Sequence, residues 1–197
     1  MASKMKSSFV NMVLILGAIA AISGTSLGYV FELTKAPIAK AKAEKLKKAI
    51  ALVAPEFEEV NAYMVAPADG KGDSLFFYDV TKGGEVVGTA VKCWTDKGFS
   101  GRMWAIVAFL PDGSINNSNI LEHKETPGLG DKTDIAKSTW NEQFKGKNPA
   151  DYKLIVTKDG GDVDAITAAT ISSRAYCDAI QRGYDAFMKN KEEGGNN

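Results

Sequence analysis

An uncharged, largely apolar run near the amino terminus constrains the fold of this chain most strongly. Positions 7–31 hold no charged side chain, and residues 9–31 supply 23 mostly apolar positions. At about 1.5 Å per residue, a helix of that length crosses a hydrocarbon core of about 30 Å. A removable signal peptide is the alternative, because Lys4 and Lys6 precede the run and small residues occupy 23–25. The run is longer than a typical signal core, which favours a retained single-span helix over 9–31.

The charges that flank this run give no decisive orientation by themselves. Lysines precede it at positions 4 and 6 and follow it at 35, 40, 42 and 45. A tail of only residues 1–8 commonly stays in the cytoplasm, which favours an extracytoplasmic globular part. Glycines at 17, 24 and 28 would let a neighbouring helix pack closely, which favours partner subunits within the membrane.

A second helix is expected directly after the span, over residues 32–55. Pro37 suits a first helical turn, apolar residues recur at helical spacing as far as Val53, and Pro55 would end the helix. Lysines fill the other face, either as a solvated surface or as a contact with lipid headgroups. We interpret this segment as a stalk that docks on the globular domain.

Composition excludes several classes of function. The 197-residue chain carries 24 Lys and Arg against 24 Asp and Glu, so no net basic field steers it to nucleic acid. Cys93 and Cys177 stand far apart in sequence, and His123 is the single histidine. Zinc and iron–sulfur sites need clusters of such ligands, so we assign no metal site. Two separately buried thiols are favoured over a disulfide.

The middle of the chain has the alternation of strands. Turn residues at 82–84 and 111–113 separate apolar, β-branched runs into two hairpins. The expected strands cover residues 75–80, 84–94, 102–110 and 114–123. Four or five successive strands of this kind predict an antiparallel sheet.

Helical patterns follow the strands, which predicts an α+β fold. We expect helices over 132–144 and 172–188, with a short strand over 153–157 between them. The length and a hydrophobic content of 45% allow one core-bearing domain, which we place at 56–190. The polar residues 191–197 are expected to form a disordered tail.

The segment 164–173, DAITAATISS, lies just before the last helical pattern. The first turn of a helix has unpaired N–H groups and a positive dipole end, both of which favour a phosphate. A hydroxyl at Thr170 would lie where a phosphate could be bonded. The alternative is an ordinary N-cap, since Ser and Thr are common at helix starts.

Two glycine-bearing stretches precede this segment. The loop 123–132 reads HKETPGLGDK, in which Pro127 fixes one backbone angle while Gly128 and Gly130 free their neighbours. Such a loop can bring backbone groups close to a flat ligand, although a generic surface turn has the same composition. The string GFSG at 98–101 precedes the third expected strand.

In combination these strings resemble the FMN-binding domain family. Asp164, two spacers, Thr167, a small residue, Ala169 and Thr170 match its flavinylation motif, although Ala168 stands where Gly is commoner. ETPGLG and GFSG resemble two further stretches of the family, in the same order. The resemblance implies that Thr170 carries FMN through a phosphoester, attached by a dedicated flavin transferase.

The resemblance also implies roles for the residues around Thr170. Asp164 belongs to the signal that the transferase reads. The residues that would approach the isoalloxazine are Glu125, Thr126, Gly128, Leu129 and Gly130. The residues that would surround the phosphate are Thr167, Ala168 and Ala169, with Ser173 as a helix cap or a phosphate contact.

Three charged or titratable residues near the loop have ordinary alternatives. Lys124 and Lys132 could offset phosphate charge, although exposed lysines usually only increase solubility. His123 could donate a proton to reduced flavin, but a packed or solvated histidine is the favoured interpretation at the end of a strand.

The resemblance implies an electron carrier, because flavin exchanges single electrons and the protein need only position and tune it. The sequence shows no Ser/His/Asp set or Cys/His pair, so we expect no complete active site. The family includes FMN subunits of Rnf-type ion-translocating ferredoxin:NAD oxidoreductase complexes. The resemblance therefore implies a bacterial or archaeal cell membrane and other complex subunits as partners. An FMN subunit of a sodium-translocating NADH:quinone reductase, a non-redox membrane-anchored scaffold and non-covalent FMN are the alternatives.

Overall fold

A computed structural model describes residues 8–194, and these form two compact units divided between Lys45 and Leu46. The expected tail of residues 1–8 falls, except for Ser8, outside the described residues. The first unit is helical, and the second contains the sheet.

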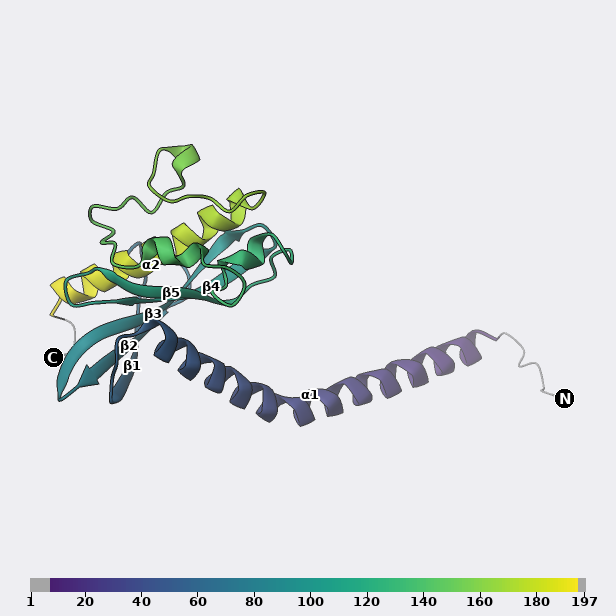
Figure 1. Ribbon diagram of the computed structural model, residues 1–197. Coiled ribbons are helices and arrows are strands. Elements are labelled where there is room, and N and C mark those ends of the chain that lie inside the picture. Colours follow the sequence, from purple (N-terminus) through teal and green to yellow (C-terminus); the bar gives the residue numbers. More distant parts are fainter. Residues whose placement is uncertain (1–7, 195–197) are drawn as a thin grey trace. The chain divides into compact units, whose positions relative to one another are not determined.

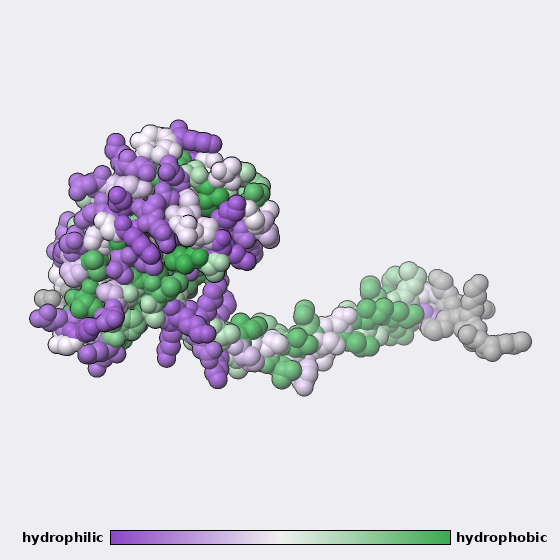
Figure 2. Space-filling view, viewed as in Figure 1, coloured by the Kyte–Doolittle hydropathy of each residue, from purple (hydrophilic) through white to green (hydrophobic). Residues whose placement is uncertain are grey.

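The first unit belongs to one continuous helix, α1 (Phe9–Val53). We expected a separate helix over 32–55 with Pro37 in its first turn, but Pro37 lies inside α1. Figure 1 shows α1 as one helix. Proline removes one backbone hydrogen bond, and the bonds on either side of it continue the helix here. In the described part of the chain, α1 is the one helix long and apolar enough to cross a membrane. Its apolar side chains are exposed along the first unit (Figure 2).

The second unit is built on an antiparallel sheet, as expected. Between residues 8 and 194 the sheet has five strands in the order β1-β2-β3-β4-β5, each paired with its sequence neighbour. The strands are β1 (Glu59–Val65), β2 (Leu75–Lys82), β3 (Glu85–Gly98), β4 (Gly101–Phe109) and β5 (Ile115–Glu122). The four strands placed from sequence are confirmed, whereas β1 was not placed because its mostly exposed residues lack a clear apolar alternation.

The sheet buries apolar side chains on both faces, with the period of two that strands impose. In β4, Met103, Ala105 and Val107 belong to one core cluster. Ile106 and Ala108 belong to another. Both faces are therefore covered, one by α2 and one by the last turns of α1.

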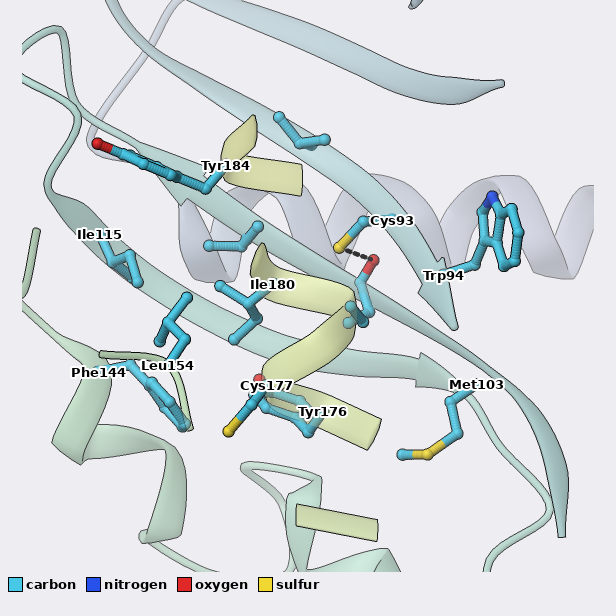
Figure 3. Close-up of a cluster of buried hydrophobic side chains, with 14 of the residues drawn as sticks. Cys93, Trp94, Met103, Ile115, Phe144, Leu154, Tyr176, Cys177, Ile180 and Tyr184 are labelled. Carbon is cyan, nitrogen blue, oxygen red and sulfur yellow. Dashed lines mark hydrogen bonds between the residues drawn. The ribbon is translucent and has the colours of Figure 1, made fainter. Parts of the chain in front are cut away.

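The helix α2 (Thr170–Glu192) covers the larger cluster. Figure 3 shows Tyr176, Cys177, Ile180 and Tyr184 of α2 beside sheet residues such as Ile115. The helix begins two residues before the expected start at 172 and continues past 188. Lys191 and Glu192, which we expected in a disordered tail, are helical, and 195–197 lie outside the described residues.

The other face of the sheet receives the end of α1, within the second unit. Ala49, Ile50 and Val53 are buried there. The side-chain amide of Asn116 donates to the Val53 carbonyl at 2.6 Å, which satisfies one of the helix's last carbonyls. The helix ends two residues before Pro55. The part of the expected stalk that lies within the second unit therefore packs on the sheet.

Two expected elements are wrong. Residues 132–144 do not form one helix, but contain the 3₁₀ turns η1 (Gly130–Thr133) and η2 (Trp140–Phe144). Between them, the Asp134 carboxylate accepts the Ala136 N–H at 2.9 Å and the Ser138 hydroxyl accepts the Trp140 N–H at 3.1 Å. Short polar side chains of this kind compete with helical hydrogen bonds.

The expected strand at 153–157 is also wrong. Val156 makes a single isolated bridge with Val163, and the turn η3 (Thr157–Asp159) follows at once. The Asp162 carboxylate accepts the Lys153 N–H at 2.7 Å, so this segment folds back on its own loop instead of joining the sheet.

The two cysteines are free, buried thiols, as predicted. The Cys93 thiol donates to the Ala105 carbonyl at 3.6 Å (Figure 3). Burial raises the pKa of both thiols to about 12. They therefore stay protonated at neutral pH and serve as small apolar core residues.

Candidate functional site

A hollow of about 360 Å³ opens beside the start of α2, and we call it the N-terminal hollow. Three segments that are distant in sequence meet in it: the β3–β4 turn, the loop after β5, and the start of α2. Its lining residues are Phe99, Glu125, Thr126, Leu129, Gly130, Ala168, Ala169, Thr170, Ile171 and Ser172. Seven of these ten were candidates from sequence alone, so the fold brings the motifs together.

The start of α2 presents unpaired backbone donors. Ala169 is the N-cap, and the first helical bond runs from the Ser173 N–H to the Ala169 carbonyl at 3.0 Å. The N–H groups of 170–172 precede that bond and lie at the positive end of the helix dipole. Thr170, half-buried, is the first helical residue. An anion would be stabilised at this position.

The turn before α2 contains a backbone conformation that is rare for alanine. Ala168 has a φ of 61°. The Ala169 N–H donates to the Ile166 carbonyl at 3.0 Å, which closes the turn. The left-handed region is disfavoured for residues with a Cβ, so surrounding contacts must hold the turn.

Asp164 is held through its backbone while its carboxylate stays exposed. The Gln143 side chain accepts the Asp164 N–H at 2.9 Å, and the Trp140 indole N–H donates to the Asp164 carbonyl at 2.6 Å. Trp140 and Gln143 were not candidates from sequence, because they precede Asp164 by more than 20 residues and lie in the turn η2. They order the first residue of the string that resembles a flavinylation motif.

Ser173 differs from its expected role. Its hydroxyl is fully buried, accepts the Ile166 N–H at 2.9 Å and donates to the Ala169 carbonyl at 3.1 Å. It therefore neither caps α2 nor faces the hollow. Its hydroxyl instead links the backbone of Ile166 to that of Ala169. These two bonds support the conformation of Ala168, which lies between them.

The loop after β5 makes a tight turn at the wall of the hollow. The Leu129 N–H donates to the Thr126 carbonyl at 3.2 Å, and Gly128 has a φ of 80°. With Pro127 at the second position, these features define a type II turn, which requires glycine at its third position. Gly128 thus shapes the loop without lining the hollow, while Leu129, 39% exposed, presents an apolar side chain to it.

Glu125 is the buried carboxylate of this wall. It is 5% exposed. Its Oε2 accepts the Ser172 hydroxyl at 2.5 Å, and its Oε1 accepts the Ser100 N–H at 3.1 Å. The Glu125 N–H donates to His123 Nδ1 at 3.1 Å, which gives the histidine a local structural contact. The carboxylate therefore joins all three segments of the hollow.

Sequence reasoning missed part of the apolar rim. Phe99 is 65% exposed and Ile171 is 47% exposed, and both line the hollow with Leu129. A large aromatic residue between the glycines of GFSG was the available signal, because such a turn exposes its side chain. Thr167, Lys124 and Lys132 are not among the lining residues.

One glycine of each stretch, Gly98 and Gly130, is required because a Cβ there would have no room. A Cβ on Gly130 would contact Ser172 Oγ and lie 2.8 Å from Glu125 Oε2. A Cβ on Gly98 would lie 2.9 Å from Glu125 Oε1. Both distances are shorter than van der Waals contact, and a Cβ on Gly98 would also overlap the Gly101 carbonyl oxygen, so only glycine fits at either position.

Known proteins match this chain across the site. The FMN-binding domain family matches residues 98–185, a range that includes all three segments of the hollow. The G subunit of the ion-translocating oxidoreductase complex of Cereibacter sphaeroides is 35% identical over 196 residues, covering 95% of this chain and 88% of the relative. Its counterpart in Shewanella loihica is 33% identical, with 95% and 93% covered. That of Aliivibrio fischeri is 34% identical, with 98% and 95% covered.

The site fits the cofactor after which the matched family is named. Unpaired donors at a helix start suit a phosphate, and an apolar rim suits a flat ring. Together with α1, the comparisons make the chain a single-pass membrane protein with an FMN-binding domain. The chain belongs to the family of G subunits of ion-translocating oxidoreductase complexes.

Proposed function

We propose that this chain is an electron-carrying subunit of an Rnf-type ion-translocating oxidoreductase complex and holds FMN covalently through a phosphoester to Thr170. One observation carries the proposal. Thr170, the acceptor that the flavinylation motif predicts, is the first residue of α2 and lines the same hollow as Glu125, Thr126, Leu129 and Gly130. The membrane-anchored domain has no complete active site of its own, and the other subunits of the complex are its redox partners.

The residues of the hollow divide between the two ends of the ligand. The N–H groups of 170–172 offset the charge of the phosphate. Phe99, Leu129 and Ile171 provide apolar surface for the ring and exclude water from it. FMN supplies one-electron and two-electron transfer when bound, so these residues need only fix its position and surroundings.

In attachment, the Thr170 hydroxyl oxygen forms a bond to the flavin phosphorus of a phosphoanhydride donor that the flavin transferase binds. The anhydride P–O bond breaks, the other phosphate half of the donor leaves, and the hydroxyl proton passes to solvent. Asp164 and Thr167 are both exposed, so the enzyme can reach them. The backbone of Asp164 is fixed by Trp140 and Gln143, which presents the motif in one conformation. Thr167 contributes to recognition and carries no bond.

Flavin fluorescence in denaturing gels tests the linkage. In cells that contain the transferase, the full chain is expected to keep a fluorescent band in SDS, and Thr170→Ala is expected to lose it. Thr167→Ala serves as the neighbouring control, because its residual label should map to residue 170 by peptide mass. Fluorescence that persists in Thr170→Ala overturns the residue assignment. Flavin that purifies with the chain but leaves in SDS indicates non-covalent FMN, and a chain without flavin indicates a non-redox module.

We place the domain on the extracytoplasmic side of the membrane, where a covalent tether prevents loss of the cofactor by dilution. The two native thiols are buried, so an added surface cysteine gives a clean test. Lys137 is exposed and is not among the residues that line the hollow. In intact cells, Lys137→Cys is expected to react with a membrane-impermeant maleimide. Reaction only after the cells are broken would place the domain in the cytoplasm.

A further inference from the structure

The hydrogen bonds of Glu125 connect parts of the N-terminal hollow that are far apart in sequence. Ser100 precedes Glu125 by 25 residues, and Ser172 follows it by 47 residues. Ser100 is adjacent to Phe99 on the rim, and Ser172 lies in the same helical turn as Thr170. One buried side chain therefore links the apolar rim to the helix that bears the acceptor hydroxyl.

The surroundings of Glu125 leave its carboxylate little freedom. Gly98 and Gly130 pack so closely that a methyl group on either would lie within 3 Å of a carboxylate oxygen. The two glycines thus create the room into which the carboxylate fits. A side chain confined by packing, and held at both oxygens by donors, has one conformation.

We propose that Glu125 is a positioning residue, which fixes the spacing between the rim and the start of α2 through its bonds to Ser100 and Ser172. We call this arrangement of one carboxylate and two donors the Glu125 clasp. The effect of the clasp on flavin loading rests on the proposed function. Its effect on the hydrogen exchange of the two segments it joins does not. The clasp acts through its two bonds and not through the charge of the carboxylate.

Glutamine separates these two properties. A glutamine side chain at this position has the same size, and its oxygen can accept the Ser100 N–H while its NH₂ group donates to the Ser172 hydroxyl oxygen. Glu125→Gln therefore removes the charge and retains both bonds. Glu125→Ala removes both bonds, and Ser172→Ala removes only the bond to α2.

Amide hydrogen exchange on the full-length chain in detergent, purified from cells without the transferase, tests the clasp without cofactor. In Glu125→Ala, amides of 99–101 and 171–173 are expected to exchange about tenfold faster, because two buried hydrogen bonds are lost. In Glu125→Gln they should stay within about threefold of the wild type. Ser172→Ala should accelerate 171–173 and spare 99–101. Glu142→Ala, which removes an exposed carboxylate of η2, is the control and should change neither segment.

A second arm uses cells that contain the transferase. Flavin loading per folded protein is expected to fall about tenfold in Glu125→Ala and to stay within about twofold in Glu125→Gln, whose visible circular dichroism should match the wild type. If Glu125→Gln behaves as Glu125→Ala in both arms, the charge is what matters and the clasp is overturned. If Glu125→Ala does not fold, Ser172→Ala decides, because the clasp requires faster exchange at 171–173 and unchanged exchange at 99–101 in that variant. If the wild type takes no flavin, the proposed function fails while hydrogen exchange still decides the clasp.

Discussion

The two ends of α2 lie beside hollows with similar chemistry and different frameworks. The N-terminal hollow contains Glu125, and a second hollow of about 260 Å³ at the other end of the helix contains Asp79. Both carboxylates are buried, at 5% and 7% exposure, and each accepts a hydroxyl at close range. For Asp79 the donors are Thr89 at 2.6 Å and Tyr63 at 3.2 Å.

The difference lies in what the hydrogen bonds connect. Asp79 belongs to β2, and the sheet already pairs it with Thr89 of β3 and with Asn61 of β1. Glu125 lies in a loop beyond β5, and its partners are 25 and 47 residues away. The same kind of hydrogen bond therefore reinforces an existing sheet in one hollow. In the other hollow it joins segments that are distant in sequence into one wall. Loss of the Asp79 carboxylate should therefore lower the free energy of unfolding, whereas loss of the Glu125 carboxylate should lower flavin loading.

Glycine substitutions give the largest expected contrast between the hollows. Gly130→Ala places a Cβ against Glu125 and Ser172, and we expect flavin loading to fall about tenfold from overpacking. Gly88 lines the second hollow, and its Cβ would lie 3.1 Å from the Phe109 carbonyl oxygen and 3.3 Å from the Pro55 ring, so its neighbours need to move by only tenths of an ångström. Gly88→Ala is the matched control and should keep loading within about twofold. In-gel flavin fluorescence, normalised to folded protein, measures both, and equal losses would remove the contrast.

Asp79→Ala should lower stability and spare the site. The Thr89 and Tyr63 hydroxyls lose their acceptor, which costs about 1–3 kcal/mol of unfolding free energy. Thermal unfolding followed by tryptophan fluorescence, on the full chain in detergent, should show the lower midpoint. Flavin loading per folded molecule should equal the wild type. A loss of loading as large as that in Glu125→Ala would mean that the two carboxylates have the same role.

Tyr63→Phe should change how stability depends on alkaline pH. Burial, followed by the charge of Asp79, raises the pKa of Tyr63 from 10.0 to about 12. The unfolded chain thus loses this proton first, so the contribution of Tyr63 to stability is complete below about pH 10 and declines as pH rises towards 12. Without the phenol, the fall in the unfolding midpoint between about pH 10 and 12 should be shallower, because at most one fewer proton is released on unfolding. An unchanged slope would show that the phenol titrates normally.

Ala168→Gly should have the smallest effect. Ala168 has a φ of 61°, where glycine is not strained, so the free energy of unfolding should rise by up to about 1 kcal/mol. The same thermal measurement applies, and flavin loading should not change because the turn is already formed. A fall in stability would mean that the turn carries no strain at this residue.

Much of the framework followed from local patterns. The alternation of apolar residues predicted four of the strands, and the turn residues at 82–84 and 111–113 predicted their hairpins. The failures at 132–144 and 153–157 arose because side chains such as Asp134 and Asp162 bond to the backbone and replace regular structure. Seven lining residues of the hollow came from motif strings, whereas Phe99, Ile171 and Ser172 required the fold.

The sequence by itself determined the membrane span, four strands of the antiparallel sheet and the candidate acceptor, because each is marked by local patterns of residues along the chain. Only the tertiary structure decided that Glu125 meets Ser100 and Ser172, and that Ser173 supports the turn instead of facing the ligand. These contacts depend on the packing of segments tens of residues apart, and that packing is fixed by the core and not by the local pattern of side chains.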